Sequence, residues 1–581
     1  MAEITAKKLI INYIDLNLVL AEYFNVDNLE LAYYRVKCWP DRLVKDRFGI
    51  NAFGANLENN LKLLSEKIIS CNYSPQKGFK FYEPKSSGTQ RTKTLLMIED
   101  ALVYQAISNK IAQKVYPQLA ENENFVFGSV LSPNVRLGQD ILKTENPNLF
   151  FFKFWKSLFG KFKESVIKAI EEDKAIYKFE TDITGFFDSI PHYNLLLTLS
   201  SEFGVEDEIL NILSQCFNAW SGTKDNSTPG VGIPQGPQPS FFFANLLLHP
   251  LDKQVISDGH KYYRYMDDIK IYGYSEEDLL DVLVLIDNYL KSHGLSINSK
   301  KTSIQKIDVG SEDETVKEFR RIIIMSDEYE GVSGEITIQN DSIDGNIIKN
   351  LSSIFEQTNE DLIDSNFELI SSPEAIIEFW ENEIKIVDEE LPALFKTDSI
   401  ELVNPDKTDD IDFIRYSAKY GTALRALKEM KIIEANQDLL KYWLFALKKY
   451  FWRASNLVIT LQYYKENPIL KRELKELYKY GKNYECYRYH IVNCMTYNFN
   501  YQDKELRDFF KILKEEKSVL VKYAIYCLII KHSKDPQLLS TIKGNIGNET
   551  NEYLKLIVLE YWKKDRNRID TMEELIKSVG L

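Results

Sequence analysis

The chain has 581 residues, of which 44% are apolar and 13% aromatic, enough for two to four domains with cores of their own. No apolar run approaches the roughly 18 residues that a membrane helix needs, and the N-terminal MAEITAKKL lacks a secretory pattern. We therefore expect a cytoplasmic protein without a membrane partner. The six cysteines form no CxxC pair, which argues against a zinc site. The formal net charge of −14 argues against nucleic-acid binding unless basic residues gather locally.

Phenylalanine and lysine alternate along residues 147–170, PNLFFFKFWKSLFGKFKESVIKAI. Rings beside cations can stack bases and bind the phosphates of a single strand. A buried helix whose lysines point outward explains the same letters, and we favour that interpretation. Binding to a membrane surface would need a similar pattern and is the weakest of the three alternatives.

A first candidate carboxylate follows in the stretch IYKFETDITGFFDSIPH. Residues 175–183 alternate like a strand, and a turn and an amphipathic helix over 194–203 come next. Asp182 ends the strand, so its carboxylate should project at the edge of a sheet. A simple strand-end cap is the alternative.

A loop rich in glycine and proline, GVGIPQGPQP, occupies residues 230–239, and an apolar helix is predicted over 240–251. Such a loop lets the backbone approach a nucleotide or a template strand closely. Gln235 adds a side chain that can both donate and accept hydrogen bonds to a sugar or base.

The most informative stretch is KYYRYMDDIKIYGY, residues 261–274, which reads as two strands around a tight turn that carries Asp267 and Asp268. An ordinary Asp-Asp hairpin turn is the alternative. Carboxylate oxygens are, however, the ligands of hard cations. Together with Asp182 they give three carboxylates from two neighbouring strands, enough to hold two Mg²⁺ ions for a phosphoryl displacement.

The order of these three motifs, followed by GLSINSKKT at 294–302, resembles the palm of a reverse transcriptase. The upstream stretch YEPKSSGTQRTKTLLMIEDALVYQAI, residues 82–107, is similar to the fingers of that family. The resemblance covers residues 30–305, about half of the chain. It implies an α+β right-hand polymerase, with fingers followed by a palm of antiparallel strands backed by helices.

The resemblance assigns roles to single residues. Asp182, Asp267 and Asp268 match the catalytic, metal-binding carboxylates, with Mg²⁺ or alternatively Mn²⁺ as the cofactor. Phe187 stands where an aromatic ring lies under the sugar C2′ and rejects a ribose hydroxyl, unless it is a core residue like Phe186.

The remaining assigned residues would handle the incoming nucleotide. Gln235 and Gly236 match the motif that contacts it, and Lys85 and Arg91 match a lysine and an arginine that bind its triphosphate. Lys301 matches the lysine that supports departure of pyrophosphate as a general acid, with a solvated lysine pair as the alternative. The expected partners are deoxynucleoside triphosphates, an RNA template and a single-stranded DNA product.

The sequence also departs from the family's pattern. VKEFRRIIIMSDEYEG, residues 316–331, replaces the usual hydrophobic-Leu-Gly turn, which puts the primer-grip region in doubt. No HNH endonuclease cluster, no cysteine-rich finger and no convincing RNase H domain are legible.

The C-terminal half differs in composition and in its predicted secondary structure. Residues 331–412 are rich in acidic and polar residues, with helices predicted over 345–356 and 372–390, and fit a thumb or a connecting segment. From residue 411 the predicted helices are short and closely spaced: 411–430, 436–450, 455–466, 469–480, 485–497, 503–514, 518–532, 536–543, 551–564 and 572–579. This spacing favours an all-α array of paired helices, although no strict period is legible. Its tyrosines and lysines suit a nucleic-acid groove, or ordinary helix surfaces, which we favour.

A reverse-transcriptase core followed by such an array resembles the abortive-infection and defence-associated reverse transcriptases of bacteria. That resemblance implies an antiphage role in a bacterial cytoplasm and allows homo-oligomers, a noncoding RNA partner, and protein-primed or untemplated synthesis. We predict four parts: an N-terminal region with fingers (1–174), a palm (175–330), a thumb-like or connecting segment (331–412) and a helical-repeat domain (413–581). A group II intron-like or domesticated enzyme acting on one RNA, and a non-catalytic nucleic-acid scaffold, are the alternatives.

Overall fold

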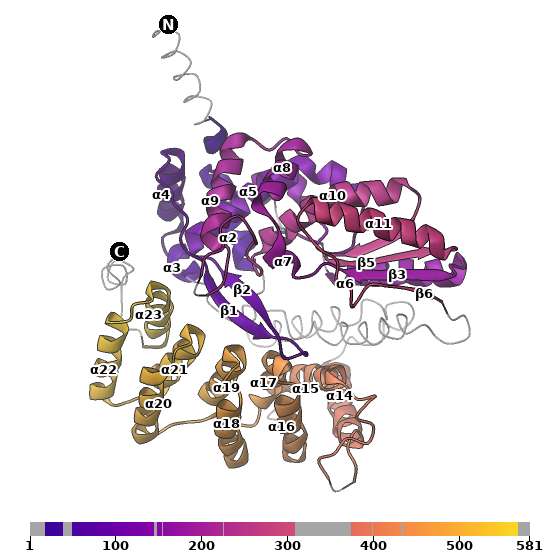
Figure 1. The fold of residues 1–581 in the computed structure, drawn as a ribbon. Coiled ribbons are helices and arrows are strands. Elements are labelled where there is room, and N and C mark those ends of the chain that lie inside the picture. Colours follow the sequence, from indigo (N-terminus) through magenta and orange to yellow (C-terminus); the bar gives the residue numbers. More distant parts are fainter. Residues whose placement is uncertain are drawn as a thin grey trace. The chain divides into compact units, whose positions relative to one another are not determined.

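The computed structural model describes residues 18–38, 49–144, 148–153, 155–224, 226–307, 373–397, 399–430 and 434–566. The chain divides into two compact units, one formed by residues 1–81 and 92–317 and the other by residues 82–91 and 318–581 (Figure 1). The first is α+β and the described part of the second beyond residue 372 is almost entirely helical, which confirms the predicted fold class. No described helix combines the length and the apolar character that crossing a membrane requires.

The first unit contains a four-stranded antiparallel sheet. Its strand order is β4 (Lys261–Tyr265), β5 (Asp268–Gly273), β3 (Tyr177–Asp182) and β6 (Ser303–Lys306). Aromatic and β-branched residues favour these strands because such side chains pack well on a pleated surface. The predicted strands over 175–183 and on both sides of the Asp-Asp turn are thus confirmed to within two residues.

Helices α10 (Gln238–Ser257) and α11 (Glu276–Ser292) are among those that pack against this sheet (Figure 1). In α11 the buried residues recur at intervals of three or four and form one apolar stripe: Leu279, Val282, Ile286 and Leu290. Ser275 caps the start of α11, where its side chain accepts hydrogen bonds from the backbone of residues 277 and 278. The sheet is therefore anchored on an apolar layer, which fixes where its strand ends lie.

The rest of the first unit is mostly helical. Its helices are α2 (Val26–Cys38), α3 (Ile50–Gly54), α4 (Leu57–Ile69), α5 (Ile98–Ala120), α6 (Trp155–Ile167), α7 (Phe186–Ser189), α8 (His192–Ser201) and α9 (Asp207–Trp220), with a 3₁₀ helix at Pro133–Lys143. A two-stranded sheet pairs β1 (Phe79–Pro84) with β2 (Gln90–Leu95), and residues 82–91 of this hairpin belong to the second unit. Apolar side chains from these helices other than α6, and from the four-stranded sheet, form one continuous core.

The aromatic and lysine-rich segment is largely a core element, as favoured from the sequence. Phe151, Phe162 and Val166 are at most 1% exposed, and Phe162 packs against the ring of Tyr265 at the end of β4. Phe150 is an exception at 62% exposed. The rings of Phe151 and Phe162 are therefore not free to stack on bases.

The second unit contains a row of short helices (Figure 1). They are α14 (Pro373–Ala393), α15 (Asp410–Met430), α16 (Leu440–Lys449), α17 (Ala454–Leu461), α18 (Pro468–Tyr480), α19 (Glu485–Asn498), α20 (Asp503–Glu515), α21 (Val519–His532), α22 (Pro536–Gly547) and α23 (Glu552–Arg566). The predicted helices between 372 and 564 are confirmed, with small shifts at their ends. Those over 345–356 and 572–579, and residues 316–331, lie outside the described residues.

The helices from α16 onward form an array whose period becomes visible only in three dimensions. N-cap residues recur at Asn436, Asn467, Gln502 and Asp535, so successive intervals are 31, 35 and 33 residues. The second helix of each pair contacts its equivalent in the next pair, as α19 does with α17 and α21. The period was not legible in the sequence because Asn, Gln and Asp serve the same capping purpose.

Candidate active site

Strand pairing brings Asp182 and Asp268 together. They are direct partners in the antiparallel register of β3 and β5, so their side chains lie on the same face of the sheet. Asp267 precedes β5 in the tight turn, and its carbonyl accepts a hydrogen bond from the Ile183 backbone at 3.2 Å. Three carboxylates from two strands therefore gather at one sheet end.

The surroundings of Asp268 disfavour its charge. Burial is the main cause that raises the pKa of Asp268 to about 6, and the negative charges of Glu180, Asp267 and Asp182 add to it. Lys270 opposes this shift while it also forms an ion pair with Glu180 at 2.7 Å. The site accumulates negative charge that a cation would relieve.

Asp182 has one oxygen paired and one unpaired. Its Oδ2 atom accepts a hydrogen bond from Lys301 Nζ at 2.5 Å. Its Oδ1 atom is buried and has no hydrogen-bond partner among the residues described. The ion pair raises the pKa of Lys301, so the amine stays protonated. A buried carboxylate oxygen without a partner is costly unless a ligand completes it.

These residues fit a divalent cation by their chemistry. All three offer hard oxygen donors, two of them face each other across paired strands, and one oxygen lacks a partner. Within the described residues, no group of three His, Cys, Asp or Glu side chains is already arranged to hold a metal ion. Asp182, Asp267 and Asp268 would hold such a cation, which would supply the positive charge that this site lacks.

The pKa of Asp268 leads to a testable dependence of stability on pH. In the metal-free folded protein this carboxyl keeps its proton up to about pH 6, whereas in the unfolded chain it ionises near ~3.9. Between these values the folded state binds more protons, so this group's contribution to the free energy of unfolding falls as pH rises. Asp268→Asn should therefore stabilise the chelator-treated protein at pH 8, by about 1–3 kcal/mol, and much less at pH 4.5. Melting temperatures at the two pH values measure this, and an equal change at both would contradict it.

The predicted sugar contact, Phe187, belongs to the short helix α7. Its ring is 7% exposed and meets the edge of the Phe241 ring at a centroid distance of 5.1 Å. The carbonyl of Phe187 accepts a hydrogen bond from Ile233 at 2.9 Å, which ties α7 to the glycine- and proline-rich loop. Phe187 thus packs like a core residue, and its role toward the sugar stays a prediction.

The loop that carries Gln235 and Gly236 is hydrogen-bonded to the C-terminal end of β2. The carbonyl of Gln235 accepts a hydrogen bond from the Thr94 backbone at 2.9 Å. Gly236 has a φ of 138°, and a Cβ there would lie 3.0 Å from the Thr94 carbonyl oxygen. Only glycine fits this close approach, so the backbone of residues 235 and 236 is fixed while the Gln235 side chain stays half-buried.

His192 holds the start of the same loop and was missed by the sequence reasoning. Its Nε2 atom lies 2.6 Å from the carbonyl oxygen of Gly232, and its backbone amide donates to the Gly230 carbonyl at 2.8 Å. Burial lowers the pKa of His192, which favours the neutral ring. His192 stands two residues before the helix predicted over 194–203, and nothing in the sequence there signals this contact.

The two predicted triphosphate ligands belong to the hairpin formed by β1 and β2. Lys85 lies in the turn between β1 and β2, where its backbone amide donates to Thr89 at 2.8 Å. Arg91 in β2 lies 3.8 Å from Glu83 across the same hairpin. Both belong to the second unit and the three carboxylates to the first. Their role toward a triphosphate stays a prediction.

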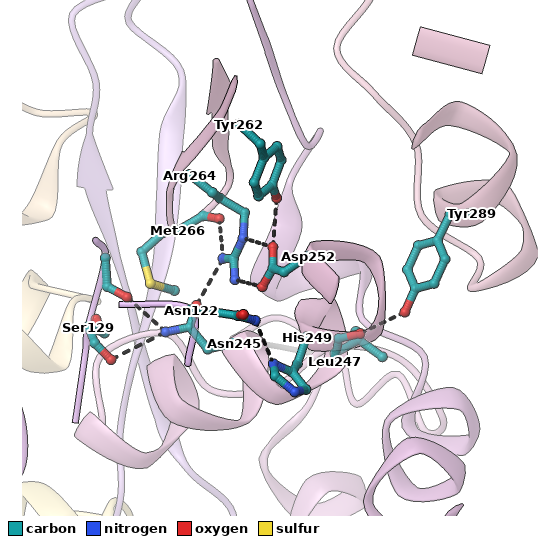
Figure 2. A network of polar contacts seen from close by, with 11 residues as sticks. Asn122, Ser129, Asn245, Leu247, His249, Asp252, Tyr262, Arg264, Met266 and Tyr289 are labelled. Carbon is teal, nitrogen blue, oxygen red and sulfur yellow. Dashed lines mark hydrogen bonds and ion pairs between the residues drawn. The ribbon is translucent and has the colours of Figure 1, made fainter. Parts of the chain in front are cut away.

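A buried polar network surrounds Arg264, two residues before Met266 (Figure 2). Arg264, next to last in β4, is fully buried and donates to Asp252 at 2.6 and 2.7 Å. It also donates to Asn245 at 2.9 Å and to the Met266 carbonyl at 2.8 Å. The one sequence signal for this network is an arginine within an otherwise aromatic strand, which the sequence analysis did not single out.

Comparisons with known proteins agree with this geometry. Residues 85–324 match the family model described as reverse transcriptase (RNA-dependent DNA polymerase). An uncharacterized 91 kDa protein in the cob intron of Schizosaccharomyces pombe (strain 972 / ATCC 24843) is 26% identical over 244 residues, which are 42% of this chain. The chain spans about a quarter of the length of that relative (26%).

Solved structures of telomerase also align with the chain. Telomerase from Candida albicans with a fragment of telomeric RNA has a TM-score of 0.34 at 12% identity, over 72% of this chain and 64% of that one. Apo telomerase from Candida tropicalis has a TM-score of 0.30 at 13% identity, over 63% and 68%.

The family match and the strand geometry agree on the same part of the chain. The matched residues contain Asp182, Asp267 and Asp268, whose strands pair in the register described above. They also contain the loop of Gln235 and the Lys301 ion pair. Residues 85–324 are a reverse-transcriptase domain, the type of domain found in RNA-directed DNA polymerases.

Proposed function

We propose that this chain is a Mg²⁺-dependent DNA polymerase that copies RNA. The observation that carries the proposal is the register of β3 and β5, which sets Asp182 opposite Asp268 with Asp267 in the adjoining turn. The raised pKa of Asp268 and the unpaired Asp182 oxygen support a cation at this point. The match of residues 85–324 to the reverse-transcriptase family supports the reaction class.

Each residue then has a defined task. The three carboxylates hold the cations, which supply charge neutralisation and an activated 3′-hydroxyl when bound. The fixed backbone at Gln235 and Gly236 orients the incoming deoxynucleotide. Phe187 leaves no room for a 2′-hydroxyl. Lys301, protonated beside Asp182, gives a proton to the departing pyrophosphate.

Replacing Lys301 by methionine tests two effects of this side chain: its ion pair with Asp182 and its proposed role as a general acid. Because Lys301 occupies Asp182 Oδ2, its loss should lower the Mg²⁺ concentration that gives half-maximal synthesis. Because a general acid contributes about 10²–10⁴-fold, the maximal rate should fall by at least about a hundredfold. Rates over a Mg²⁺ series and a pH series measure both effects. Lys300→Met, which changes an exposed neighbour, is the control. An unchanged maximal rate would remove the general-acid role.

The proposed activity is tested with purified protein, Mg²⁺ and labelled deoxynucleotides, with and without added RNA template and primer. The double variant Asp267→Ala/Asp268→Ala runs alongside, and products are divided by nuclease and protease treatment. Synthesis on a supplied RNA that the double variant lacks supports the proposal. Synthesis that the double variant retains would assign the activity to a contaminant, and no synthesis even with co-purified RNA would favour a non-catalytic scaffold.

We further propose that this DNA synthesis serves antiphage defence in a bacterial cytoplasm. The support is the combination of a reverse-transcriptase domain with the helical array from α16 to α23. Bacteria that express the wild type should show fewer plaques than bacteria that express the double variant. Product that stays with the protein until protease treatment would show that synthesis is primed by the protein itself. Equal plaque numbers across a broad phage panel would contradict the defence role.

A second candidate is an enzyme that acts on one specific RNA, as a group II intron-like or domesticated reverse transcriptase. The relative from the cob intron favours it. The two candidates differ in what the purified protein carries: one defined RNA that is also the preferred template supports the second. Synthesis that is indifferent to the added RNA, or independent of it, supports the first.

A further inference from the structure

The turn that carries the two adjacent carboxylates has a conformation that its sequence does not favour. Tyr265 and Asp268 are paired across β4 and β5, so Met266 and Asp267 alone form the loop of the hairpin. Met266 has a φ of 58°, in the left-handed region. Two-residue hairpin loops use glycine, asparagine or aspartate at such a position, because a residue with a larger side chain is strained there. Something outside the loop must therefore hold it.

The Arg264 side chain supplies that hold. It reaches back under the turn and donates from Nη1 to the Met266 carbonyl at 2.8 Å (Figure 2). Its other donors are fixed at the same time: Nε and Nη2 on Asp252, and Nη1 also on Asn245. A fully buried guanidinium held on three sides cannot rotate away, so the Met266 carbonyl has a fixed partner.

The partners of Arg264 are themselves anchored. Asp252, in α10, also accepts the hydroxyl of Tyr262 at 2.6 Å. Asn245, in the same helix, donates to the carbonyls of Gly128 and Ser129 at 2.8 and 3.3 Å. The network therefore joins the Asp-Asp turn to α10 and to the segment around residue 128.

Gly128 closes the turn from another side. A Cβ built on Gly128 would lie 2.4 Å from the backbone nitrogen of Met266, so the two backbones are in direct contact. The backbone of Arg264 is bonded to this same segment, since it donates to Phe125 and accepts from Phe127 at 2.8 Å each. Two contacts therefore confine Met266: the hydrogen bond that its carbonyl accepts from Arg264, and the close approach of the Gly128 backbone to its nitrogen.

We propose that Arg264 is a positioning residue that holds the Met266–Asp267 turn in its left-handed conformation and thereby places the Asp267 and Asp268 carboxylates for metal binding. The inference rests on the proposed function of these carboxylates. If Arg264 did not donate to the Met266 carbonyl, Met266 would relax toward a negative φ. The carboxylate of Asp267, the next residue, would then change direction.

The test uses Arg264→Lys, which keeps a positive charge beside Asp252 but cannot reproduce the forked contacts. We expect the maximal rate of DNA synthesis to fall at least about tenfold, because a small misplacement of a metal ligand is costly. The Mg²⁺ concentration for half-maximal rate should rise about threefold or more, while the KM for deoxynucleotide stays within about twofold. Tyr289→Phe removes only the hydroxyl bond to the Leu247 carbonyl of α10, which lies outside the contacts of Arg264. It is the control, with a lowered melting temperature and an unchanged Mg²⁺ requirement.

A rescue experiment separates positioning from general loss of packing. In the Arg264→Lys background, Met266→Gly and Met266→Ala remove similar side-chain volume, but only glycine takes a positive φ without strain. Glycine should restore the rate at least about threefold more than alanine. Equal rescue by both, or an Arg264→Lys protein whose Mg²⁺ requirement is unchanged, would overturn the proposal.

Electron paramagnetic resonance can follow the binding of Mn²⁺ to the protein without nucleotide. This measurement distinguishes failure of the positioning role from failure of the polymerase proposal. If the wild type makes no DNA but Arg264→Lys weakens Mn²⁺ binding and Met266→Gly restores it, the positioning role stands and the polymerase proposal falls. If the wild type polymerises and Arg264→Lys matches it in rate and in Mn²⁺ binding, the polymerase proposal stands and the positioning role falls.

Discussion

Asparagine in place of Asp182 should reduce DNA synthesis by about a thousandfold or more. The substitution keeps the shape of the side chain but removes the charge that would face a cation together with Asp268. Lys301 loses its ion pair, yet its side chain is 67% exposed, so the cost in stability should be small. Primer extension at saturating nucleotide and Mg²⁺, with melting temperature measured on the same preparation, gives both quantities.

Asp258→Asn is the matched control for this prediction, because Asp258 is exposed at the end of α10. Its rate should equal that of the wild type. If Asp182→Asn retained more than a small part of the activity with an intact fold, Asp182 would be a strand-end residue and not a metal ligand.

Alanine in place of Phe187 should allow ribonucleotides to be incorporated. Removal of the ring opens space beside the predicted sugar position, so the preference for deoxynucleotides over ribonucleotides should fall by about a hundredfold. The measurement is the ratio of kcat/KM for the two nucleotides of the same base. A buried Phe→Ala substitution also costs about 3–5 kcal/mol, so the assay temperature must stay well below the melting temperature of the variant.

Phe186→Ala is the control for the selectivity of Phe187. Phe186 is a buried neighbour, 2% exposed, and its truncation loses the same number of atoms from the same core. Its nucleotide preference should match the wild type even where its stability falls as much. No gain of ribonucleotide incorporation in Phe187→Ala would show that Phe187 is a core residue alone.

Local patterns predicted the elements well, because alternation and helical spacing are written in neighbouring residues. The strand expected over 175–183 is β3, Tyr177–Asp182, and the helices expected from 485 and 503 begin at those residues. Helix α10 runs to Ser257, beyond the predicted end at 251, and continues through Pro250. A proline inside a helix is tolerated where packing on both sides holds the flanking turns, and the sequence gives no sign of that packing.

Contacts between residues far apart in the chain could not be predicted from the sequence alone. The Asp182 and Asp268 partnership depends on the register of β3 against β5, which is set by the whole sheet. The Arg264 contacts join residues from β4 and α10, with Asn245 and Asp252 in a helix predicted only as apolar. The motifs located the carboxylates, but neither the resemblance nor the spacing showed what supports the turn.

The capped helix pairs from residue 436 onward have a consequence for how the chain can vary. Each pair begins with its own N-cap and adjoins mainly the pair before and the pair after it, as in the ion pairs of Arg488 with Glu516 and of Lys522 with Glu549. The pair α18–α19 also binds the β1–β2 hairpin, through Glu485 to the Tyr82 backbone and through Tyr484 to Gly88. Insertion or loss of a whole pair beyond α19 would rebuild the same contacts between neighbouring pairs and would leave the pairing of β3 with β5 unchanged. We therefore expect the length of the array beyond α19 to vary between relatives of this protein without a matching change at Asp182, Asp267 and Asp268.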